Sequence, residues 1–99
     1  MSELPETLHL GPMDYTLDPV QDLRHRHEKV DGHVSYHETA IYVEAQTGEQ
    51  CQRATIWHEV LHVILAQAGY PEHDEAQLEV LAHGIMDALR RNPWLRGDA

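Results

Sequence analysis

The stretch Thr55–Leu65, TIWHEVLHVIL, decides the fold. It belongs to a longer segment, residues 49–68, which predicts an α-helix, and its apolar residues cover most of the helical cylinder, so the helix is expected to be buried on nearly all sides. Gly69 suits the position just after this helix, and Pro71 follows as a stop signal. A helix with so much apolar surface needs other elements packed around it.

A second helix is predicted over residues 75–91, with Asp74 as its N-cap. The apolar residues expected on its inner face are Leu78, Leu81, Ile85, Met86 and Leu89. Because the link of residues 66–74 is short, we expect the two helices to pack as a hairpin. Trp94 and Leu95, in the tail of residues 92–99, are expected to fold back onto the body.

Residues 6–45 form a β-rich half. Two short strands are predicted within residues 6–20, on either side of the turn-forming pair Gly11-Pro12, and Pro19 limits the second of them to an edge or end position. Residues 21–31, QDLRHRHEKVD, are expected to be a loop or a short exposed helical turn.

Gly32 opens a second two-strand stretch, which ends in the most β-prone run of the chain, residues 40–44. The fold class is therefore α+β: a small antiparallel sheet of two hairpins, packed on the helix of residues 49–68 and on the C-terminal helix. Residues 1–99 are expected to be a single domain.

Composition narrows the class of protein. The chain has 99 residues and 41% hydrophobic residues, enough for one modest core. Seven Lys and Arg against 17 Asp and Glu give a formal charge of −10, which disfavours nucleic acid and anionic membranes as partners. No membrane span or signal peptide is recognised, so we expect a soluble, cytoplasmic protein. The single Cys51 excludes a disulfide framework.

Chemistry is concentrated in His58-Glu59-Val60-Leu61-His62, an HExxH motif. Residues four apart share one face of a helix, so the two imidazoles can reach one Zn²⁺. Glu59 lies beside them and can act as general base on a water that zinc activates. The alternative is a pair of buried histidines hydrogen-bonded to backbone or carboxylate groups.

A catalytic zinc site has three protein ligands and one open position. We expect the third ligand on the second helix, where Glu79 lies next to the apolar residues Leu78 and Leu81 and should point inward. Glu75, His73 and His83 remain alternatives for this ligand. Tyr70, Tyr42 and His83 are candidates for stabilising an oxyanion.

The HExxH stretch, the LEVLAHGI segment of the second helix, the strand AIYVEA and the tail LRRNPWL resemble the minimal gluzincins. More closely, nearly the whole chain is similar to short phage-type members of the ImmA/IrrE-like metallopeptidase family. The resemblance implies a zincin-like core, His58 and His62 as zinc ligands, Glu59 as general base and Glu79 as the glutamate ligand. Larger relatives cleave helix-turn-helix repressors, so a protein substrate of that kind is an expectation.

The resemblance also implies that the strand before the active-site helix is a sheet edge that pairs with an extended peptide substrate. In this chain its residues would be Ile41, Tyr42, Val43, Glu44 and Ala45. The predicted function is peptide-bond hydrolysis with zinc as cofactor. Two alternatives stay open: a zinc-stabilised structural or interaction module, perhaps encoded by a phage, and a zinc-free acidic adaptor. The oligomeric state is not indicated by the sequence.

Overall fold

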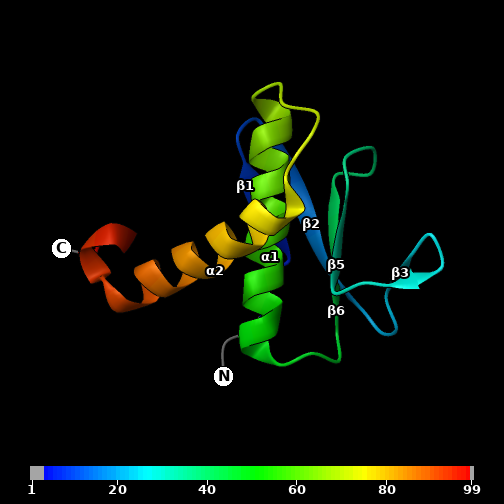
Figure 1. The fold of residues 1–99 in the computed structure, drawn as a ribbon, viewed down its shortest axis with the longest axis horizontal. Helices are drawn as coiled ribbons and strands as arrows, with labels where there is room; N and C mark the ends of the chain where they lie inside the picture. Colours follow the sequence, from blue (N-terminus) through cyan, green and yellow to red (C-terminus); the bar gives the residue numbers. More distant parts are fainter. Residues whose placement is uncertain (1–3, 99) are drawn as a thin grey trace.

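A computed structural model describes residues 4–98 as an α+β fold with a mixed four-stranded sheet, a separate two-stranded sheet and two helices (Figure 1). The elements are β1 (Thr7–Leu10), β2 (Met13–Val20), β3 (Arg24–His25), β4 (Glu28–Lys29), β5 (Gly32–Ser35), β6 (Ala40–Glu44), α1 (Glu49–Gln67), α2 (Glu75–Arg91) and the 3₁₀ turn η1 (Pro93–Arg96). In this part of the chain, neither helix is both long and apolar enough to cross a membrane.

The four-stranded sheet has the order β1-β2-β6-β5. Both predicted hairpins are confirmed, because β1 pairs antiparallel with β2, and β5 pairs antiparallel with β6. The prediction of an antiparallel sheet is wrong, because β2 and β6 are parallel, with Leu17 opposite Ile41. The second hairpin places its last and most apolar strand against β2, and this strand runs in the same direction as β2.

The interior position of β6 corrects the expectation that residues 41–45 form a sheet edge. β6 pairs with β2 on one side and with β5 on the other, so the edges of the sheet are β1 and β5. Ile41 and Val43 are fully buried, which explains why this strand has an almost continuous apolar sequence. The strand edge that remains unpaired next to α1 is therefore that of β5.

Pro19 lies next to the end of β2, as predicted. Thr16 donates its N–H to the carbonyl of Thr39, on the β6 side of the strand. Leu17 donates in the opposite direction, to Glu6. Because successive residues alternate, the nitrogen of Pro19 faces the β1 side at a point beyond the end of β1, where a missing N–H breaks no ladder bond.

Residues 21–31 form a two-stranded hairpin, so the predicted loop or helical turn is wrong. Arg26 and His27 both have positive φ, at 53° and 70°, as the type I′ hairpin turn requires. Asn-Gly or Asp-Gly ordinarily makes that turn. Neither pair occurs in residues 21–31, so no local signal predicted the hairpin. Buried Leu23 fixes the base of the hairpin by donating its N–H to the carboxylate of Glu44 at 2.8 Å.

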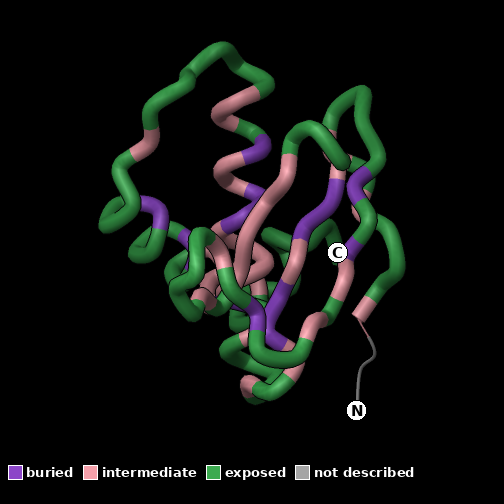
Figure 2. The backbone as a smooth tube through the Cα atoms, turned by 90° about the vertical axis from the view of Figure 1, so that its right-hand side faces the viewer, coloured by how far each residue is buried: buried purple, intermediate pink, exposed green. Residues whose placement is uncertain are grey.

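The core lies between the sheet and α1 (Figure 2). Its buried residues are Tyr15, Leu17, Ile41, Val60 and Val63. The expectation that α1 is buried on nearly all sides is wrong, because Ile64, one turn beyond Val60, is 48% exposed. The apolar residues cover most of this helix, but the chain supplies one sheet face and the first half of α2 to pack against them.

The bounds predicted for the second helix are confirmed, and Asp74 caps it by accepting the N–H of Gln77 at 3.0 Å. The predicted helical hairpin is wrong, because the linker runs back beside α1 and α2 then crosses it (Figure 1). Only Leu78 and Ala82 of α2 are buried. Trp94, 78% exposed, does not fold back onto the body as expected, because the crossing carries the end of α2 away from the sheet.

Candidate metal centre

His58 and His62 project from neighbouring turns of α1, as their spacing predicts. Both side chains are 13% exposed, and their ring centroids are 4.9 Å apart. The helix is anchored from the other side by Val60 and Val63, which are buried in the core. The two imidazoles are therefore held side by side on a rigid element.

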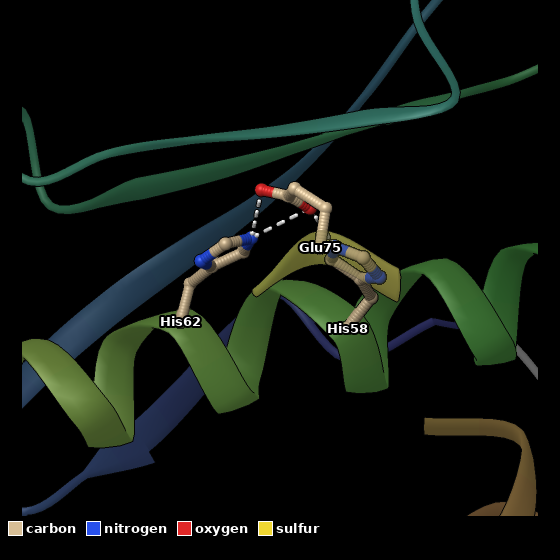
Figure 3. Close-up of side chains that lie close together, drawn as sticks. All are labelled: His58, His62 and Glu75. Atoms are coloured by element: carbon tan, nitrogen blue, oxygen red, sulfur yellow. Dashed lines mark hydrogen bonds and ion pairs between the residues drawn. The ribbon is translucent and has the colours of Figure 1, made fainter. Parts of the chain in front are cut away.

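Glu75, the first residue of α2, closes the group from above (Figure 3). One of its carboxylate oxygens lies 2.7 Å from Nε2 of His58, and the other lies 3.0 Å from Nε2 of His62. One ligand atom from each of the three residues can be chosen so that all lie within 4.8 Å of one another. Two imidazoles and one carboxylate are a ligand set that catalytic zinc sites use, so the residues present fit this metal.

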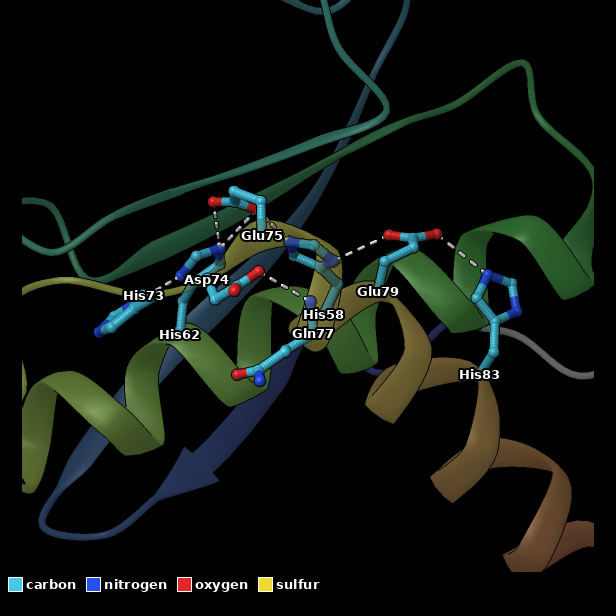
Figure 4. Close-up of polar contacts among 8 residues, drawn as sticks. All are labelled: His58, His62, His73, Asp74, Glu75, Gln77, Glu79 and His83. Atoms are coloured by element: carbon cyan, nitrogen blue, oxygen red, sulfur yellow. Dashed lines mark hydrogen bonds and ion pairs between the residues drawn. The ribbon is translucent and has the colours of Figure 1, made fainter.

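Glu79 lies on the other side of His58, where an oxygen of its carboxylate is 2.9 Å from Nδ1 (Figure 4). Its second oxygen accepts a hydrogen bond from Nε2 of His83 at 3.0 Å. His83 therefore reaches the centre only through Glu79. Glu79 as the third ligand stays a prediction, while the observed contacts bring Glu75, one of the alternatives, to both Nε2 atoms.

The path of the linker explains this arrangement. Residues 68–74 run back along α1, so the first turn of α2 lies beside the middle of α1 (Figure 1). In a helical hairpin, Glu79 would have been the better-placed carboxylate. In the observed crossing, Glu75 is closest to the histidine pair, and the sequence carries no local signal for the angle at which two helices cross.

His73, at the end of the linker, contacts His62 from the side away from Glu75. The two Nδ1 atoms are 2.6 Å apart, and Nε2 of His73 lies 2.6 Å from the carbonyl oxygen of Tyr70 (Figure 4). His73 was an alternative for the third ligand. Here it instead lies at the ring nitrogen of His62 that faces away from the carboxylate of Glu75.

Glu59 is buried, with 7% of its surface exposed. Burial raises its pKa to about 7, and the charges of Glu75 and Glu79 act in the same direction, while His58 opposes them. A carboxylate with a pKa near neutrality suits a general base better than an ordinary surface glutamate does. The role of Glu59 as general base stays a prediction.

Glu75 and His62 shift one another's pKa values. Partial burial alone would raise the pKa of Glu75, but the hydrogen bonds and charges of His58 and His62 lower it overall. Burial lowers the pKa of His62, against the opposing effect of Glu75. Taken separately, the lowered pKa of Glu75 favours its carboxylate form and the lowered pKa of His62 favours its neutral form, and these are the forms of the two residues that bind a metal ion.

A cleft of about 550 Å³ lies over the histidine pair, between β5, α1 and α2. Asp31 accepts the N–H of Glu44 in the β5–β6 ladder, so the alternate residues Gly32 and Val34 direct their N–H and C=O groups away from β6. Both residues line the cleft. An unpaired strand edge therefore borders the candidate metal centre.

Tyr36 also lines this cleft and was missed among the candidates for stabilising an oxyanion. Burial raises the pKa of its phenol, as do the charges of Glu59, Tyr15 and Glu75. Tyr42, a predicted candidate, donates its hydroxyl to Glu38 at 2.7 Å, and Tyr70 is 61% exposed. Tyr36 directly follows the edge strand β5. This position could have indicated Tyr36 only if β5 had been recognised as the edge of the sheet.

Comparison of the chain with protein-family models, with curated proteins and with solved structures found no match. Function is therefore inferred from the residues of the site.

Proposed function

We propose that this chain is a minimal zinc-dependent metallopeptidase, in which His58, His62 and Glu75 hold the metal and Glu59 is the general base. The observation that carries this proposal is the convergence of both Nε2 atoms on one carboxylate, in a cleft that Glu59 also lines. Three protein ligands leave a tetrahedral metal one open position, which is the arrangement that hydrolysis needs.

When bound, zinc would polarise a peptide carbonyl and make a water molecule easier to deprotonate. Glu59 would take the proton from that water, since it lines the same cleft as the three ligands and its pKa is about 7. It would then be able to return the proton to the leaving amine. Tyr36, which also lines the cleft, would be a phenol donor for the carbonyl oxygen as negative charge develops there.

An extended peptide is the substrate class that the cleft fits best. Gly32 and Val34 offer backbone donors and acceptors along the free edge of β5, so a peptide could add to the sheet as a further strand. We also propose that the chain has a zincin-like core and is related to the short ImmA/IrrE-like metallopeptidases that its sequence resembles. That resemblance supports a protein substrate such as a repressor.

The test compares the native protein with Glu59→Gln, using labelled casein and a quenched peptide library as substrates. We expect both proteins to bind one zinc per chain by elemental analysis, and the variant to lose cleavage by about 100-fold or more. Glu28→Gln, at an exposed position in β4, is the control and should cleave normally. A native protein that binds no zinc, or a Glu59→Gln variant that cleaves at the native rate, contradicts the proposal.

A zinc-stabilised structural or interaction module is the second candidate function. The observation in its favour is that the site joins α1 to α2, while only Leu78 and Ala82 of α2 are buried. A metal could replace the missing apolar contact between the helices. Zinc binding without cleavage of any substrate in the native protein would favour this module over the peptidase.

A further inference from the structure

The linker between the two helices supplies a group that acts on the candidate metal ligand His62. His73 precedes the N-cap of α2, and its ring centroid is 4.9 Å from that of His62. The nearest atoms of the two rings are their Nδ1 atoms, 2.6 Å apart. A contact of that length between two ring nitrogens is a hydrogen bond, so one nitrogen carries the proton and the other accepts it.

The direction of this hydrogen bond follows from the other end of His73. Its Nε2 lies 2.6 Å from the carbonyl oxygen of Tyr70, which can only accept, so Nε2 carries a proton. A neutral imidazole has one N–H, and Nδ1 of His73 is therefore the acceptor. When Nε2 of His62 is free to bind a metal ion, the single ring proton is on Nδ1, so Nδ1 of His62 is the donor in this hydrogen bond.

We propose that His73 is a positioning residue that accepts the Nδ1–H of His62 and so keeps the lone pair of its Nε2 directed at the metal position. This inference rests on the proposed metal site. The chain of contacts runs from the Tyr70 carbonyl through His73 to His62, and it ends at the Nε2 that faces Glu75. Orienting partners of this kind fix both the tautomer and the ring plane of a histidine ligand.

The arrangement at His58 is parallel but uses a carboxylate. Nδ1 of His58 lies 2.9 Å from a carboxylate oxygen of Glu79, and Nε2 faces Glu75, so a His58 that binds a metal through Nε2 would donate its Nδ1–H to Glu79. Each candidate ligand of α1 is thus held at Nδ1 by a group from outside α1, and both outside groups belong to the segment that returns across the helix. The linker and the first turns of α2 would therefore determine how well the metal is bound.

The test measures zinc affinity by competition with a chromophoric chelator. His73→Phe removes the acceptor, and we expect it to weaken zinc binding by about 10- to 100-fold. His73→Asn places an amide oxygen near the position of Nδ1 and should restore most of the affinity. His37→Phe, at an exposed position between β5 and β6, is the matched control and should bind zinc normally.

A spectroscopic readout separates positioning from loss of structure. In long-range ¹H–¹⁵N spectra of the zinc-loaded protein, the Nδ1–H of His62 should exchange slowly with water, and His73→Phe should make this exchange faster. Native zinc affinity in His73→Phe, or equal losses in the Phe and Asn variants, would overturn the role of His73. A native protein that binds no zinc would instead overturn the proposed function itself.

Discussion

At Gly32 the edge strand β5 lies close against the helix that carries HExxH. A Cβ atom at this position would collide with Cγ2 of Thr55 and would come within 3.3 Å of a carboxylate oxygen of Glu59. Thr55 is β-branched and has little freedom to move aside. The absence of a side chain at Gly32 therefore allows β5 to lie directly over the proposed general base.

We expect Gly32→Ala to destabilise the fold by about 1–3 kcal/mol, the usual cost of overpacking. Equilibrium urea unfolding measures this change. Thr55→Ser removes the colliding methyl group, so the double variant should recover most of the lost stability. Gly84→Ala is the control and should raise stability, because a Cβ atom at this position would contact nothing and alanine favours the helix. A Gly32→Ala protein as stable as the native one would refute the close contact.

The carboxyl group of Glu44 makes the stability of the fold depend on pH. The N–H groups of Leu23 and Gln46 donate to its carboxylate and, with the nearby Lys29, lower its pKa below the ordinary value of 4.5. A carboxyl group whose pKa is lower in the folded state stabilises the fold above its unfolded pKa. This contribution is lost as the pH falls through the folded pKa.

We expect Glu44→Gln to have a lower free energy of unfolding than the native protein at pH 7. The difference in the free energy of unfolding between the two proteins should decrease as the pH is lowered from 5 to 3. Urea unfolding of both proteins at each pH isolates the contribution of this one carboxyl group. A gap that is constant across this range would mean that Glu44 holds the hairpin by packing alone.

At the scale of elements, local patterns predicted where most helices and strands begin and end. The 3.6-residue periodicity, Gly69 and Asp74 gave the helix bounds, and Gly11 and Gly32 marked the two hairpins. The features that were missed depend on contacts between distant segments. Parallel pairing of β2 with β6, and the crossing of α2 over α1, are decided by which apolar faces meet rather than by any short stretch of sequence.

The first two turns of α2 carry two carboxylates whose roles differ in the proposed site. Glu75 faces both Nε2 atoms, so Glu75→Gln should weaken zinc binding by more than about 100-fold, as expected for a lost ligand. Glu79 contacts Nδ1 of His58, so Glu79→Gln should cost about 10- to 100-fold. Chelator competition measures both, with Glu72→Gln in the linker as control. The reverse order of losses would identify Glu79 as the ligand, as the resemblance implies.

On the scale of the whole molecule, the candidate site divides into a local part and a part made by the topology. HExxH was recognisable because a single helical turn brings its two histidines together. Glu75, His73 and Tyr36 come from a returning linker and from the residue after an edge strand, so their approach depends on the complete fold. The core between one sheet face and one side of α1 is small, and α2 projects beyond it.

A metal joining α1 to α2 should therefore change the stability of the whole chain. Free zinc at 100 times its dissociation constant stabilises a folded protein by about 2.7 kcal/mol. For a chain of this size each kcal/mol raises Tm by about 4–8 °C, so we expect a rise of about 10–20 °C over the chelated protein. Calorimetry with zinc and with EDTA measures this change in Tm, and the Tm of His62→Ala should not respond to zinc.

On zinc binding, hydrogen exchange should slow most in α2, because the sheet and α1 share a core that needs no metal. A native Tm that zinc leaves unchanged would mean that the helices are not joined through these residues.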